Sequence, residues 1–75
     1  MRYGAVRLGF ESLAEMEAAA AQITNTSDYT PWEDPNVEAL TIHNIEESDA
    51  RAFAKAFNAG LEAWDPAEEE WQDID

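Results

Sequence analysis

Apolar and polar residues alternate through the first ten positions of the chain. Val6, Leu8 and Phe10 fall on one side of this alternation, and the odd-numbered side chains fall on the other. A period of two residues is typical of a β-strand with one buried face. The pattern therefore predicts a strand over residues 2–10.

The next segment changes to a helical period. Ser12 and Glu15 form a capping box, in which the Ser12 hydroxyl accepts from the Glu15 N–H and the Glu15 carboxylate turns back toward the Ser12 N–H. Apolar residues then recur at intervals of three and four, at Leu13, Met16, Ala20 and Ile23. This spacing predicts a helix over about residues 12–23.

Residues 24–36 are rich in turn formers. Pro31 and Pro35 favour extended backbone in the residues before them and cannot donate to a strand ladder. Residues 28–32 are therefore either a loop or a short edge strand. Residues 37–45 are rich in β-branched side chains and apolar on both faces, which predicts a central strand.

A second helix is predicted to begin at Ser48, a candidate N-cap. The apolar residues that follow lie at i, i+4, i+8 and i+11, and they are Phe53, Phe57, Leu61 and Trp64. Such spacing makes one continuous stripe along a helix. We therefore expect the helix to continue past Gly60 with at most a brief irregularity, and Trp64 to lie in the core.

The sequence Asp65-Pro66-Ala67-Glu68 combines three signals of a helix start. Asp is a favoured N-cap, Pro is favoured at the first helical position, and Glu completes a capping box at the third. These signals predict a short third helix over residues 66–73.

The predicted elements follow the order β-α-(β)-β-α-α, which belongs to the α+β class. We expect a small sheet of two or three antiparallel strands with the helices packed on one face. Residues 1–75 then form a single compact acidic domain.

The composition indicates a folded, soluble protein of the cytoplasm. Apolar residues make up 45% of the chain and aromatic residues 11%, which is too apolar for a disordered acidic tail. The chain has no Cys, so it has neither disulfides nor a thiolate metal site. No apolar run reaches the length of a membrane span.

Acidic residues outnumber basic ones by 17 to 4, which gives a formal net charge of −13. A surface of this sign repels nucleic acid and anionic membranes, so we expect neither as a partner. The expected partner is instead a basic, Lys- and Arg-rich protein surface.

The residue types that catalysis needs are not arranged for it. His43 is the only histidine, and no Ser or Cys stands at a motif spacing from it. The acids at 68–70 lack the glycine turn and alternating ligands of a calcium loop. We expect a protein that is not an enzyme and that holds no metal or cofactor.

Residues 62–75 contain seven acids and no Lys or Arg. On a helix they would present about one carboxylate per 3 Å, close to the roughly 3.4 Å between phosphates along one DNA strand. Trp71 either anchors a partner or, together with Ile74, fastens the helix to the body of the protein. The candidate partner-binding residues are Glu62, Asp65, Glu68, Glu69, Glu70, Trp71 and Asp73, with Glu33, Asp34, Glu46 and Glu47.

In its size, its lack of Cys, its α+β pattern and its clustered acids, the chain resembles the small acidic phage-encoded anti-CRISPR proteins that mimic DNA. Inhibitors of type I surveillance complexes are the nearest likeness within that group. The resemblance implies a monomer in the host cytoplasm that blocks target-DNA binding by occupying a Lys- and Arg-lined surface. It carries over no individual residue.

Two other functions remain open at the level of the sequence. One is an antitoxin or immunity-type partner that neutralises a basic nuclease or toxin through a hydrophobic patch. The other is an accessory subunit or acidic scaffold whose charge only keeps it in solution. Competition with DNA or RNA for the partner distinguishes a mimic from an antitoxin.

Overall fold

A computed structural model of the chain describes residues 1–74. Within these residues the protein has two helices and one antiparallel sheet of five strands, in the order β2-β3-β1-β4-β5. The elements are β1 (Arg2–Gly9), α1 (Leu13–Thr26), β2 (Trp32–Asp34), β3 (Ala39–Glu46), α2 (Glu47–Phe57), β4 (Gly60–Asp65) and β5 (Glu70–Asp73). The α+β class is confirmed, but the sheet is larger than the two or three strands predicted.

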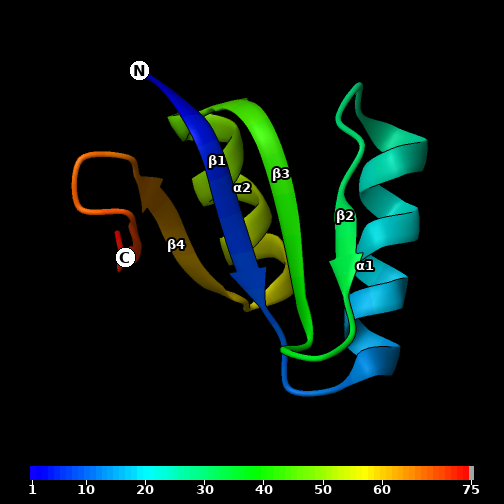
Figure 1. Cartoon of the computed structure of the whole chain (residues 1–75). Helices are drawn as coiled ribbons and strands as arrows, with labels where there is room; N and C mark the ends of the chain where they lie inside the picture. Colours follow the sequence, from blue (N-terminus) through cyan, green and yellow to red (C-terminus); the bar gives the residue numbers. More distant parts are fainter. Residues whose placement is uncertain (75) are drawn as a thin grey trace.

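The connections form a split β-α-β arrangement. Helix α1 joins β1 to β2 with β3 between them, and α2 joins β3 to β4 with β1 between them. Each joined pair of strands is parallel, because both strands are antiparallel to the strand between. Both helices therefore lie on one face of the sheet (Figure 1), and β5 extends the sheet by a hairpin from β4.

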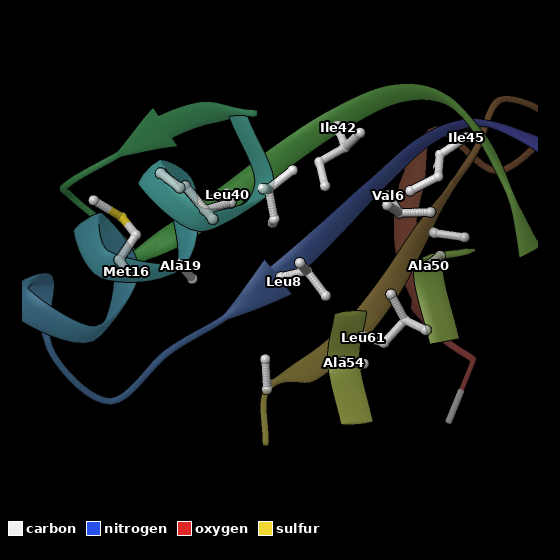
Figure 2. Packing of buried hydrophobic residues seen from close by; sticks show 14 residues of the cluster. Val6, Leu8, Met16, Ala19, Leu40, Ile42, Ile45, Ala50, Ala54 and Leu61 are labelled. Carbon is white, nitrogen blue, oxygen red and sulfur yellow. The ribbon is translucent and has the colours of Figure 1, made fainter. Parts of the chain in front are cut away.

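The core lies between that face and the helices. Val6, Leu8, Ile42 and Leu61 are almost fully buried on the sheet side, and they meet Met16 and Ile23 of α1 and Ala50 and Ala54 of α2 (Figure 2). Burying each large side chain contributes about 1.5–3 kcal/mol. The small alanines let both helices approach the sheet closely.

The first helix begins at the predicted cap, although the Glu15 carboxylate accepts from the Ser12 hydroxyl at 3.4 Å and not from the Ser12 N–H. The Ser12 hydroxyl accepts from the Glu15 N–H at 3.2 Å. The helix continues beyond residue 23 to Thr26, where the Ser27 N–H and hydroxyl both donate to the Ile23 carbonyl. Leu13, expected in the apolar stripe, is 42% exposed, and Ala19 is buried instead.

The predicted central strand forms with shifted bounds, and of the two alternatives left open for residues 28–32 the loop is found over residues 28–31. Residues 32–34 form an edge strand rather than residues 28–32, and β3 lies inside the sheet between β2 and β1. Val37 was predicted to start the central strand. It belongs instead to the β2–β3 loop and is 53% exposed.

The predicted course of the second helix is wrong at both ends. Ser48 is not its N-cap, because the helix follows β3 directly and the carbonyl of Met1 accepts the Glu47 N–H at 2.9 Å. At the other end Asn58 adopts the left-handed conformation, with φ 53°, and closes the helix after Phe57. The chain then turns into β4. Alternation along this strand places Leu61 toward the core and Trp64 on the opposite face, so the expected stripe does not form.

The predicted third helix over residues 66–73 does not form. The Asp65 carboxylate does accept from the N–H groups of Ala67 and Glu68, at 2.9 and 3.3 Å. Glu69 then adopts a left-handed conformation, with φ 54°, and reverses the chain. The open edge of β4 supplies backbone partners for residues 70–73, so the segment becomes a strand.

Candidate partner-binding surface

The face of the sheet opposite the helices carries a second set of side chains. Since the residues before and after each buried one point away from the core, strand alternation identifies this set. We call this side the open face, and its residues are Ala5, Arg7, Trp32, Thr41, His43, Glu62, Trp64, Trp71 and Asp73. No helix within the described part of the chain covers it (Figure 1).

A hollow of about 570 Å³ lies on the open face. Ala5 lies in it and is only 9% exposed although no helix covers it, because larger side chains stand around it. We call this feature the aromatic hollow, and its lining residues are Gly4, Ala5, Thr41, His43, Trp64, Pro66 and Trp71.

Aromatic pairs stand on both sides of Ala5. The rings of Trp64 and Trp71 are 5.4 Å apart at 67°, and those of Trp32 and His43 are 5.5 Å apart at 75°. Both arrangements are the edge-to-face geometry that aromatic pairs favour. The prediction that Trp64 lies in the core is wrong, since it faces outward and is 39% exposed.

Trp71 belongs to the open face as well. It is half-buried and lies on β5, directly across from Trp64 of β4. Of the two residues considered for fastening this segment, Ile74 packs against the core cluster and Trp71 does not. Trp71 is thus placed where a partner can reach it.

Arg7 connects the charged and aromatic parts of the open face. Its guanidinium carbon lies 4.6 Å from the centre of the Trp71 ring. Its Nε and Nη2 donate to Glu62 Oε1 at 3.1 and 2.9 Å. One guanidinium therefore makes both a cation–π contact and an ion pair.

The other arginines are also engaged by glutamates. Arg2 pairs with Glu46 at 2.9 Å, and Arg51 pairs with Glu47 at 3.1 Å. Hydrogen bonds from Arg51, and then from the Tyr3 hydroxyl, lower the pKa of Glu47 below its ordinary value. The candidate residues Glu46 and Glu47 are thus part of the protein's internal structure.

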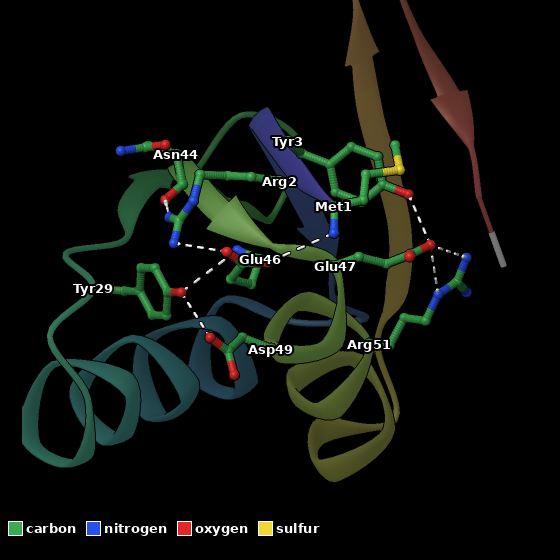
Figure 3. A network of polar contacts seen from close by, with 9 residues as sticks. All are labelled: Met1, Arg2, Tyr3, Tyr29, Asn44, Glu46, Glu47, Asp49 and Arg51. Carbon is green, nitrogen blue, oxygen red and sulfur yellow. Dashed lines mark hydrogen bonds and ion pairs between the residues drawn. The ribbon is translucent and has the colours of Figure 1, made fainter.

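These two glutamates belong to a network that joins β1, β3 and α2 (Figure 3). The Tyr29 hydroxyl donates to Asp49 at 2.7 Å, and the Glu46 N–H donates to the same hydroxyl at 3.5 Å. The hydrogen bond to Asp49 raises the pKa of Tyr29. The network fixes the end of the sheet against α2.

The remaining candidate acids do not form one surface. Glu33 and Asp34 lie on β2, at the opposite edge of the sheet from β5. Four strand spacings separate these edges, or about 19 Å. Asp34 is engaged in its own turn, where it accepts from the Asn36 N–H at 3.1 Å.

The structure does bring the C-terminal candidates together on the β4–β5 hairpin. Glu68, Glu69 and Glu70 are exposed there, and within residues 1–74 their carboxylates have neither an ion-pair nor a hydrogen-bond partner. The loop that bears the first two starts at Pro66, which lines the aromatic hollow. Asp73 lies across from Glu62 in the same hairpin.

Sequence reasoning missed the aromatic hollow, although a signal for it was present. Residues 61–65 alternate between Leu61 and Ala63 on one side and Glu62 and Trp64 on the other, as a strand requires. A second signal is the shared pattern Asp-Pro-x-x-Glu at residues 34–38 and 65–69. This pattern forms a hairpin loop in both places, and in each loop the backbone of the glutamate adopts the left-handed conformation.

Among the described residues, no three His, Asp or Glu side chains are grouped as a metal ion would need. Neither helix found in residues 1–74 has the length and apolar character needed to cross a membrane.

No protein-family model matches the chain. No curated protein matches it, and no solved structure does.

Proposed function

We propose that this protein is a non-enzymatic inhibitor that binds a basic, nucleic-acid-binding protein surface by presenting DNA-like negative charge. The particular form proposed is an anti-CRISPR protein that acts as a monomer in the host cytoplasm and blocks target-DNA binding by a type I surveillance complex. The observation that carries the proposal is the set of exposed carboxylates at Glu68, Glu69 and Glu70, which have no partner within residues 1–74.

The arginines of the protein neutralise other glutamates, so the carboxylates of these three acids are accessible to a partner at the β4–β5 hairpin. Arg2, Arg7 and Arg51 each pair with a glutamate, and none of these glutamates lies at 68–70. The carboxylates of Glu68, Glu69 and Glu70 therefore have no counterion among the described residues, whereas Glu62 of the same hairpin is paired with Arg7. A basic surface would supply the missing counterions.

The adjacency of the three acids along the chain supports the proposal even without the predicted helix. Consecutive Cα atoms are about 3.8 Å apart, close to the roughly 3.4 Å between phosphates along a DNA strand. Three adjacent glutamates at a hairpin tip thus place three negative charges on about 8 Å of backbone. Exposed ion pairs contribute about 0.2–1 kcal/mol each, so three together amount to roughly tenfold in affinity.

The test compares two variants that remove the same number of acids. The first is Glu68→Gln/Glu69→Gln/Glu70→Gln, and its matched control is Glu11→Gln/Glu17→Gln/Asp28→Asn, on and beside α1. Each is assayed for blocking of DNA binding by a panel of purified type I surveillance complexes. We expect the hairpin variant to lose about tenfold in potency and the control variant to stay near the parent. A hairpin variant as potent as the parent would contradict the proposal.

One observation favours the antitoxin or immunity-type function as the second candidate. The aromatic hollow is an exposed apolar patch beside an acidic rim, which is the arrangement such a partner needs. Competition separates the two functions. DNA displaces a mimic from its target, whereas inhibition of a basic nuclease at a site remote from its DNA groove is unaffected by a DNA oligonucleotide.

A further inference from the structure

We propose that the aromatic hollow receives an arginine side chain from an extended basic segment of the partner. This inference rests on the proposed function, because it takes the partner surface to be basic. It adds which side chain the protein selects and where that side chain binds.

The shape and lining of the hollow fit a long, flat side chain. Its volume is about 570 Å³, and its walls come from Trp64 and Trp71 on one side and His43 on the other. Ala5 keeps the space between them open. A planar guanidinium on a three-carbon stem can lie against the tryptophan rings while its stem contacts the apolar floor.

The protein already binds one of its own arginines in this way. The guanidinium of Arg7 lies over the Trp71 ring at 4.6 Å and pairs with Glu62. Trp64 stands beside Trp71 and is 39% exposed, and no cation–π contact to it is present within residues 1–74. The same chemistry is thus available at Trp64 to an arginine from outside.

An aromatic sheet face can bind single-stranded nucleic acid, a second copy of the chain or a cationic segment, and the charges of this protein favour the last. Single-stranded nucleic acid stacks its bases on such faces, but it also needs cations for its phosphates. Arg7 on the open face and Arg2 at the end of the same strand are both paired with glutamates. A second copy of the chain would bring another 13 net negative charges to the contact. A cationic segment is the one occupant that the acids of the β4–β5 hairpin attract.

Arginine is favoured over lysine by the geometry. A guanidinium stacks flat on an indole and is weakly hydrated, whereas the ammonium of lysine is compact and strongly hydrated. Net charge alone attracts both equally. A preference for arginine over lysine therefore measures binding in the aromatic hollow, because the overall electrostatic attraction is the same for both.

The test uses two fluorescein-labelled nine-residue peptides that differ at three alternate positions, which are all Arg in one and all Lys in the other. Affinity is measured by fluorescence anisotropy, and the indole N–H resonances of the parent protein are followed by NMR. We expect the Arg peptide to bind about five- to tenfold more tightly and to shift the resonances of Trp64 and Trp71. Trp64→Ala should abolish the preference, while the matched control Trp32→Ala, outside the hollow, should retain it.

Three outcomes would overturn the inference. Equal affinity for both peptides, or no binding of either, means that the hollow selects no arginine. Indole shifts produced by a single-stranded oligothymidylate but not by the Arg peptide would assign the hollow to nucleobases. Self-association that depends on Trp64 would assign it to a second copy. If Trp64→Ala does not fold, the shifts of the indole N–H resonances of the parent protein still show whether the Arg peptide binds in the hollow.

The failure of this inference is distinguishable from the failure of the proposed function. Equal peptide affinities leave the hairpin-acid test on surveillance complexes unaffected. Conversely, an arginine preference persists in the peptide assay even if no surveillance complex is inhibited.

Discussion

Glu38 and Glu69 adopt a backbone conformation that residues other than glycine rarely take. Their φ angles are 51° and 54°, and each occupies the last position of a hairpin loop. A side chain in this region strains the backbone by roughly 1 kcal/mol or more. Both residues reverse the chain at the place where glycine is the usual choice.

We predict that Glu69→Gly stabilises the protein by about 0.5 kcal/mol. Relief of the left-handed strain exceeds the added flexibility of the unfolded chain, which offsets part of the gain. Urea denaturation measures the difference. Glu69→Gln is the control, because it removes the charge but keeps the strain. A glycine variant no more stable than the glutamine variant would show that charge, not backbone strain, dominates at this position.

Tyr29 gives a prediction at alkaline pH. Its hydrogen bond to Asp49 raises its pKa in the folded state, so its contribution to stability is complete below the unfolded pKa near 10 and is lost as pH rises through the folded value. Tyr29→Phe should reduce the unfolding free energy by about 1 kcal/mol at pH 7. It should also flatten the fall in stability above pH 10.

Thermal melts from pH 7 to 11.5 measure both effects. Tyr3 also has a raised pKa, because burial and its hydrogen bond to Glu47 favour the neutral hydroxyl. Tyr3→Phe is therefore the comparison, and the double variant should show the weakest alkaline dependence. An unchanged alkaline slope in Tyr29→Phe would mean that its hydrogen bond is not maintained in solution.

At the scale of elements, the same five-residue pattern builds both hairpins. Asp34 and Asp65 each accept a backbone N–H from the residue two positions on, across an intervening proline. The proline fixes φ, the aspartate holds the turn, and the glutamate reverses the chain. One hairpin attaches β2 to the sheet and the other attaches β5.

We predict that Asp65→Ala weakens the attachment of β5. Loss of the carboxylate leaves the N–H groups of Ala67 and Glu68 without their acceptor, which destabilises the turn by about 1 kcal/mol. Hydrogen exchange at residues 70–73 should accelerate more than exchange in β1 or β3. Asp65→Asn keeps an acceptor oxygen and is the control. Uniform acceleration in every strand would instead indicate that β5 opens only with global unfolding.

Some elements could be predicted from the sequence because their signals are local. The Ser12 capping box and the alternation of residues 2–10 specify α1 and β1 without reference to the rest of the chain. The Asp65-Pro66 signal is equally local, but its turn chemistry serves a helix start and a hairpin alike. The pairing of residues 70–73 with β4 decides between them, and this contact is tertiary.

The candidate site could be predicted only in part for a similar reason. The exposure of Glu68, Glu69 and Glu70 follows from their chemistry. Their separation from Glu33 and Asp34 depends on the strand order, which no pattern in the sequence reveals. The stripe from Phe53 to Trp64 suits a helix in its spacing, and the left-handed Asn58 that interrupts it has no strong signal.

At the scale of the whole molecule, the net charge of −13 opposes the compact state. We predict that raising NaCl from 0.02 to 0.5 M increases the melting temperature by about 5 °C, which corresponds to roughly 1 kcal/mol for a domain of this size. Differential scanning calorimetry measures the shift. The variant without acids at 68–70 should respond less. A melting temperature that falls with salt would show that the ion pairs of the arginines outweigh the repulsion.

The hairpin that adds β5 also leaves that strand at the edge of the sheet, where no other strand of residues 1–74 pairs with its outer side. The outer backbone groups of such a strand form a template on which another chain can add a strand and begin a fibril. Glu70 and Asp73 place charge along this margin, and the strand spans only residues 70–73. At the isoelectric point of about 4.1 the net charge of the molecule is zero, so charge repulsion between molecules is lost. We therefore expect thioflavin-positive aggregates to form near pH 4 and to be absent at pH 7, where the net negative charge keeps copies of the chain apart.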